Sequence, residues 1–112
     1  DGSGALSFTD NSGGTSWQAV ITASTKTAVA GEGYFINTTS NVCTLTLPAG
    51  TLGNEVSVID YAGTFDTNNL TVAANGSEKI QGDAADLTVA TERAGFSLVY
   101  TDATQGWLLR EK

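Results

Sequence analysis

The chain has 112 residues, of which 40% are hydrophobic and only 15% are charged, against about 25% charged in an ordinary domain. Its net charge of −7 leaves no basic stripe for nucleic acid and disfavours binding to an anionic membrane surface. With no His and a single Cys, the sequence excludes His-based catalysis, His metal sites, an internal disulfide and a Cys zinc site.

The first residues differ in composition from the rest of the chain. Residues 1–16 are rich in Gly, Ser, Thr and Asn, and we predict a flexible arm there, in which residues 5–9 are compatible with a short strand. The remainder, residues 17–112, is expected to form one β domain with a single core. Because the chain has neither an initiator Met nor a basic or apolar leader, we expect a processed product or a piece of a longer protein.

From residue 17 onward, apolar and polar residues alternate with a period of two. Such runs, short and rich in β-branched or aromatic residues, are typical of half-buried strands. No apolar run approaches the ~18 residues of a membrane span, so we expect no membrane insertion. The alternating runs cover residues 17–24, 34–37, 42–47, 56–59, 70–73, 87–90, 96–101 and 107–110.

Turn-forming residues separate these runs. Asn75-Gly76 is the best short hairpin signal, and residues 102–106 predict a tight hairpin that closes on Gly106. The spacing between runs leaves little room for crossover helices. We therefore predict an all-β fold, a sandwich or jelly-roll-like compact barrel of about eight short strands, with less than about a tenth of the residues in helices.

Each strand is expected to turn its more apolar side to the core. This assigns to the core Tyr34, Ile36, Leu45, Leu47, Val56, Val58, Leu70, Val72, Leu98, Tyr100 and Trp107. Five apolar residues then fall on the opposite face. We interpret them as a candidate surface for self-association, because a patch of this kind usually marks an interface; they are Val20, Phe35, Ile59, Val99 and Leu108. The alternative is that the arm or loops cover them.

Acidic and amide residues do not form a recognisable site. The cluster of Asp60 with residues 66–69 lacks the spacing of a calcium loop, and we interpret it, like Asp83 and Asp86, as turn chemistry. No motif selects a carboxylate pair for catalysis. We expect no enzyme activity, no catalytic residue, no cofactor and no metal.

The Cys and the two Trp residues fit structural roles. Cys43 lies on the same side of its strand as Leu45 and is interpreted as a small buried hydrophobe. Trp107 fits a core position better than a sugar-stacking one, whereas Trp17 fits either.

A set of short segments recurs in an order and spacing that point to a known kind of module. These segments are GYFINTT (33–39), TLTLPA (44–49), AGTF (62–65), NNLTV (68–72), KIQG (79–82), LVYTD (98–102) and GW (106–107). With them, residues 17–109 resemble a module of bacteriophage tail-fibre and other virion structural proteins, notably of marine and cyanobacterial phages. The resemblance implies a structural part of the virion, a homotrimer in most cases, that contacts other virion proteins and has no catalytic residues.

Such modules usually sit inside long fibre chains, whereas this chain is short. We therefore expect either a tail-fibre or baseplate module, or a capsid decoration or head fibre protein. A host cell-surface glycan is a further candidate partner. Two other classes fit the composition: a secreted carbohydrate-binding or adhesin β-sandwich, and a subunit of an extracellular filament. An exposed aromatic pair would favour the carbohydrate-binding class.

Overall fold

The computed structural model describes residues 15–111, so the predicted arm lies outside it except for Thr15 and Ser16. No helix occurs in this range, and hence none that could cross a membrane. The strands described are β2 (Ser16–Trp17), β3 (Thr25–Thr27), β4 (Glu32–Ile36), β5 (Cys43–Thr46), β6 (Glu55–Asp60), β7 (Leu70–Ala73), β8 (Leu87–Val89), β9 (Gly95–Tyr100) and β10 (Trp107–Glu111).

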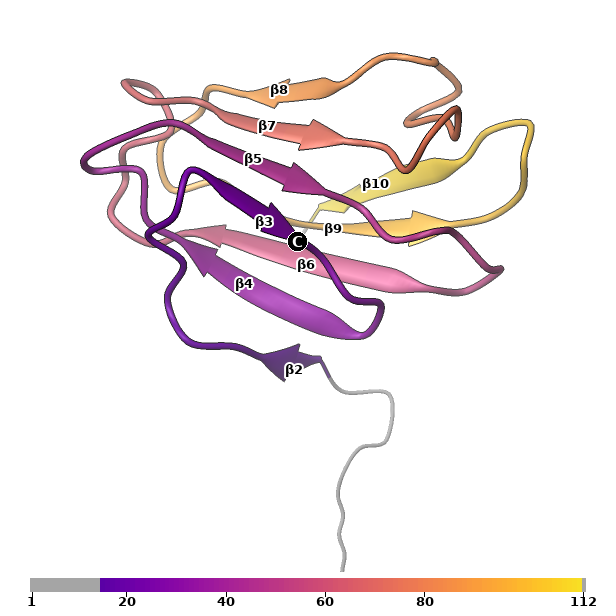
Figure 1. Cartoon of the computed structure of the whole chain (residues 1–112), viewed down its shortest axis with the longest axis horizontal. Helices are drawn as coiled ribbons and strands as arrows, with labels where there is room; N and C mark the ends of the chain where they lie inside the picture. The colour runs from indigo at the N-terminus through magenta and orange to yellow at the C-terminus, as the bar shows by residue number, and fades with distance from the viewer. Residues whose placement is uncertain (1–14, 112) are drawn as a thin grey trace, which may run out of the picture.

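The strands form two sheets that pack face to face. One sheet has five strands in the order β10-β9-β6-β4-β2, and the other has four in the order β3-β5-β7-β8 (Figure 1). Apolar residues that alternate along the strands lie between the sheets, so the period of two in the sequence corresponds directly to an inner and an outer face. The all-β prediction is confirmed.

From β2 to β7, each strand lies in the sheet opposite to its predecessor. Neighbours within a sheet are therefore two strands apart in sequence, and they pair in parallel: β2 with β4, β4 with β6, β3 with β5, and β5 with β7. A parallel pair needs a long crossover connection, which is usually a helix. Here the crossover is a strand of the other sheet, which explains why spacings too short for helices still give parallel sheets.

The last strands pair antiparallel: β7 with β8, β6 with β9, and β9 with β10. The turn at residues 101–106 joins β9 to β10, with the Gly106 N–H donating to the Asp102 carbonyl at 2.7 Å, which confirms the predicted tight hairpin. The hairpin predicted at Asn75-Gly76 is wrong. A turn is present, since the Glu78 N–H donates to the Asn75 carbonyl, but Ile80 beyond it pairs with Trp107 instead of returning along β7.

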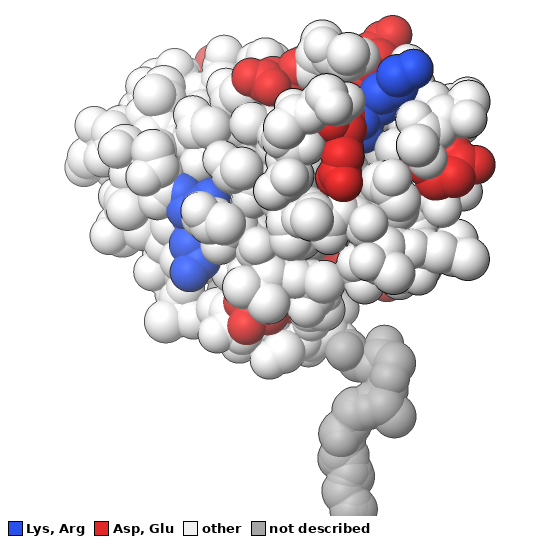
Figure 2. Space-filling model, turned by 45° about the vertical axis from the view of Figure 1, so that its right-hand side comes forward, with Lys and Arg blue, Asp and Glu red and all other residues white. Residues whose placement is uncertain are grey.

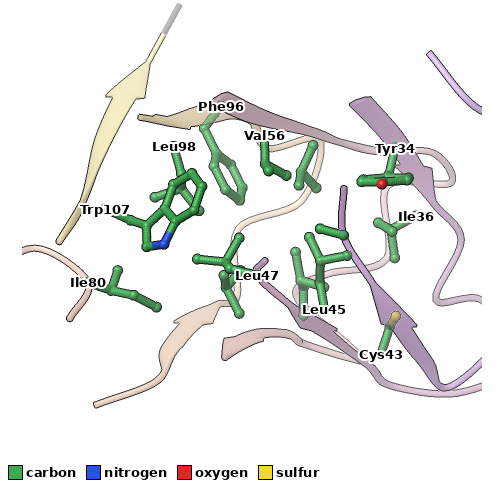
Figure 3. Close-up of a cluster of buried hydrophobic side chains, with 14 of the residues drawn as sticks. Tyr34, Ile36, Cys43, Leu45, Leu47, Val56, Ile80, Phe96, Leu98 and Trp107 are labelled. Carbon is green, nitrogen blue, oxygen red and sulfur yellow. The ribbon is translucent and has the colours of Figure 1, made fainter. Parts of the chain in front are cut away.

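All eleven residues assigned to the core are buried, and none is more than 9% exposed. In Figure 3, Trp107, Ile80 and Leu98 gather at one end of the core, and Tyr34 and Ile36 lie toward the other. The core also includes residues not on that list. These are Ala28, Cys43, Phe65, Ile80 and Phe96.

Candidate functional site

The outer face of the five-stranded sheet carries the apolar residues predicted for self-association. Phe35, Ile59, Val99 and Leu108 come from β4, β6, β9 and β10, and each lies between inward-facing neighbours on its strand. Ile59 and Leu108 are each 37% exposed, while Phe35 and Val99 are half-buried. The fifth residue, Val20, is 40% exposed and follows β2 in a connection, outside any strand.

Strand register groups four of these residues into two pairs. Leu108 lies opposite Val99, and Phe35 lies opposite Ile59. Residues directly opposite on neighbouring strands share a face and contact each other, so each pair is a compact apolar surface. The two pairs lie at different levels along the strands and do not merge into one continuous patch.

A row of small residues runs across the strands between the two pairs. The register places Ser97 opposite Ser57, and Ser57 opposite Gly33. Beyond its ends lie Arg110, opposite Ser97, and Trp17, opposite Gly33. We call this row of Ser97, Ser57 and Gly33 the trough. The hollow at this place has a volume of about 450 Å³, and Arg93 also contributes to its lining.

Hydrogen bonds fix the floor of the trough. The Ser57 and Ser97 hydroxyls lie 2.8 Å apart and are hydrogen-bonded, and both residues are buried although they face outward. Glu55, next to Ser57 on the outer side of β6, forms an ion pair with Arg110. The trough thus combines buried hydroxyls with guanidinium groups at its rim.

Two aromatic rings lie together at the β2 end of the trough. The Trp17 and Phe35 rings stack with their centroids 4.8 Å apart, and Trp17 is 42% exposed. The Trp17 indole also covers Gly33, where a Cβ would lie only 2.6 Å from a ring carbon. Trp17 is therefore a surface residue of this face, in contrast to Trp107, which is fully buried in the core as predicted.

The acidic cluster around Asp60 is a turn, as predicted. Asp60 is 1% exposed, and its carboxylate accepts hydrogen bonds from the backbone N–H groups of Gly63, Thr64, Phe65 and Arg93. This carboxylate ties the loop after β6 to the loop before β9. Within residues 15–111 no group of three His, Cys, Asp or Glu residues is placed to hold a metal ion.

The single thiol is also structural. Cys43 is fully buried, and burial raises the pKa of its thiol, which disfavours the reactive thiolate. The interpretation of Cys43 as a small buried hydrophobe is confirmed.

A second hollow, of about 330 Å³, lies where the sandwich opens between β8 and β10. Its apolar lining comes mainly from Leu87, Val89, Phe96 and Leu109. Gly95 and Phe96 also line the hollow at the trough, so both hollows border the start of β9.

Sequence patterns identified four of the five predicted apolar residues as lying on the outer face of the strands, but missed the trough. Ser57 and Ser97 stand at outward positions of their strands, yet only the register shows that they meet each other and Gly33. The sequence also gives no sign that Arg93 and Arg110 belong to this site, because isolated cationic residues on a surface form no recognisable pattern. The available signal was the outward position of small residues on three strands.

Comparison with known proteins places the chain in a family. The family model described as "Bacteriophage T4 gp9/10-like protein, N-terminal" matches residues 2–105. Over 79 residues the chain is 34% identical to the baseplate wedge protein gp10 of Enterobacteria phage T4; the match covers 68% of the chain and 13% of the length of gp10. The chain belongs to the bacteriophage T4 gp9/10-like N-terminal family.

Proposed function

We propose that the chain is a non-enzymatic structural module of a phage virion, located in the tail or baseplate. The observation that carries this proposal is the family match over residues 2–105, and the similarity to a baseplate wedge protein supports the location. The narrower resemblance, to tail-fibre modules of marine and cyanobacterial phages, belongs to the same proposal. A capsid decoration or head fibre protein is the alternative location.

The location is tested on particles of the phage that encodes the chain. Separated heads and tails are probed with an antibody against the domain. We expect the signal on tails. A signal on heads alone would favour the decoration role, and absence from both would refute a role in the virion.

We further propose that the module self-associates, as a trimer, through the outer face of the five-stranded sheet. The two apolar pairs on that face support association, since exposed apolar side chains from several strands are costly to leave in water. The number three comes from the phage-module resemblance alone. A charge-poor surface favours close packing between copies, because few charges must be desolvated.

Light scattering measures the mass of the assembly, and therefore the number of chains in it. A trimer has three times the 11.5 kDa of one chain, whereas a filament gives masses that grow with concentration. Phe35→Asp and Val99→Asp should each dissociate the assembly while the circular dichroism stays that of the folded domain. Leu52→Asp is the matched control, because Leu52 is 77% exposed in the β5–β6 turn and outside this face. A monomer at high micromolar concentration would refute self-association.

A second candidate function, contact with a host glycan, is favoured by the Trp17 ring, which is exposed and stacks on the half-buried Phe35. Aromatic faces of this kind can stack on sugar rings. The glycan and a second copy would use the same face, so light scattering also separates these candidates. A monomer whose Trp17 fluorescence changes on addition of polysaccharide would favour the glycan.

A further inference from the structure

The trough gathers positive charge on a protein that is otherwise acidic. Four of the cationic residues lie within residues 15–111, and two of them, Arg93 and Arg110, line the hollow at the trough. No Asp or Glu is among its described lining residues; Glu55, which pairs with Arg110, lies beside the hollow. Exposed acids such as Asp83, Glu92 and Asp102 lie outside it. Figure 2, which shows one side of the molecule, illustrates how sparse and how mainly acidic the surface charge is.

Both guanidinium groups retain donors for a further carboxylate. Arg110 forms its ion pair with Glu55 through one nitrogen, Nη2, and Arg93 donates through Nη1 to the Tyr61 carbonyl. A guanidinium carries five N–H donors in a planar fork that matches a carboxylate. Each of the two Arg residues at the rim of the trough therefore has N–H donors left with which it can bind a further carboxylate.

We propose that carboxylates of a second copy of this chain enter the trough and pair with Arg93 at one end and with Arg110 at the other. The inference rests on the proposed self-association. It adds to the apolar contacts a charged contact that decides whether two copies can join.

The position of the trough favours a second copy as the source of the acid. The trough lies between the two apolar pairs, so a copy that covers both pairs also covers the trough. Arg110 is paired with Glu55, but Arg93 contacts only a backbone carbonyl, and covering it without an acidic partner would leave a desolvated charge unpaired, which is strongly unfavourable. Each chain has a net charge of −7, so two copies repel unless acid on one meets a cation on the other.

The test compares two double variants with the same change of charge. In the first, Arg93→Gln and Arg110→Gln remove both cations of the trough; in the control, Lys26→Gln and Lys79→Gln remove two cations outside it. The dissociation constant is measured by light scattering at about 0.05 M and at about 0.5 M salt. The higher salt concentration shortens the electrostatic screening length about threefold. The first double variant loses the hydrogen bond from Arg93 to the Tyr61 carbonyl, so circular dichroism and urea unfolding check that it is folded.

We expect the trough variant to weaken association at least about tenfold at low salt, and the control variant to weaken it much less. Added salt should strengthen association of the trough variant, in which it screens only the repulsion between acidic copies, and should fail to do so in the unmodified protein, where it also screens the pairing of Arg with carboxylate. An oligomer that is indifferent to both Arg changes overturns this inference while self-association stands.

A protein that is monomeric under all conditions overturns the proposed self-association, and the inference with it. A monomer whose Trp17 fluorescence changes with a polyuronic acid, and not with a neutral polysaccharide, likewise overturns the inference. The acid in the trough would then come from a glycan.

Discussion

Gly106 is the position where the smallest possible substitution should do the most damage. Its φ is +72°, and an added Cβ would lie 1.9 Å from the Lys79 carbonyl oxygen. That oxygen accepts the hydrogen bond of the Trp107 N–H at 2.9 Å, at the start of β10. The obstacle is backbone, so no change of side-chain rotamer can relieve the contact.

Gly53 separates the two effects that Gly106→Ala combines. Its φ is +86°, but a Cβ there would meet nothing within 4 Å. Gly53→Ala should therefore cost only the left-handed backbone penalty, about 1–2 kcal/mol. Gly106→Ala adds to the same penalty the loss of about 1 kcal/mol for the displaced hydrogen bond and about 1–3 kcal/mol of packing strain, giving roughly 3–6 kcal/mol in total.

Urea unfolding, followed by Trp fluorescence, measures both variants at one protein concentration, because self-association would add to the stability. Hydrogen exchange at the Trp107 amide should accelerate in Gly106→Ala and not in Gly53→Ala. Equal losses of stability in the two variants would show that the contact between Gly106 and Lys79 carries no energy.

Three further predictions concern the core, a buried carboxylate and a buried phenol. Leu98→Ala should destabilise the domain by about 2–5 kcal/mol in urea unfolding, because Leu98 is fully buried, whereas Leu52→Ala, at a site 77% exposed, should change little. Asp60→Asn should cost about 2–3 kcal/mol, since an amide cannot accept all four backbone hydrogen bonds of the carboxylate; a loss below about 0.5 kcal/mol would contradict this. Burial, with the hydrogen bond to Glu32, raises the pKa of Tyr34 from 10.0 to about 12, so the unfolded chain loses the phenol proton first. The contribution of Tyr34 to stability should be complete below pH 10 and disappear as pH rises through about 12, a loss that Tyr34→Phe should not show in alkaline unfolding.

The sequence predicted which side chains are buried far better than how the strands are connected. Alternation identifies an inner and an outer side of each strand, which is enough to assign Leu45 or Leu98 to the core. It contains no information on which strands are neighbours, and parallel pairing between alternate strands therefore appeared only in the structure. Phe65 was missed for a related reason: it lies in a turn, and the Asp60 carboxylate, rather than any strand, holds its backbone.

The candidate site was predicted in the same incomplete way. Phe35, Ile59, Val99 and Leu108 share one outer face as expected, but their division into two pairs depends on register. The trough between them has no signature along the chain, because it is assembled from single small residues on three different strands.

The alternation of successive strands between the two sheets has a consequence for the order of folding. From β2 to β7 no strand has its predecessor as a hydrogen-bonding partner, so each parallel pair must enclose a whole intervening strand before it gains any contact. Closing such loops costs chain entropy before it is compensated, which slows folding. The one short hairpin in the described range, β9–β10, is the C-terminal one and is the last to leave the ribosome. We therefore expect the two sheets to form together, late and cooperatively, and not strand by strand during synthesis.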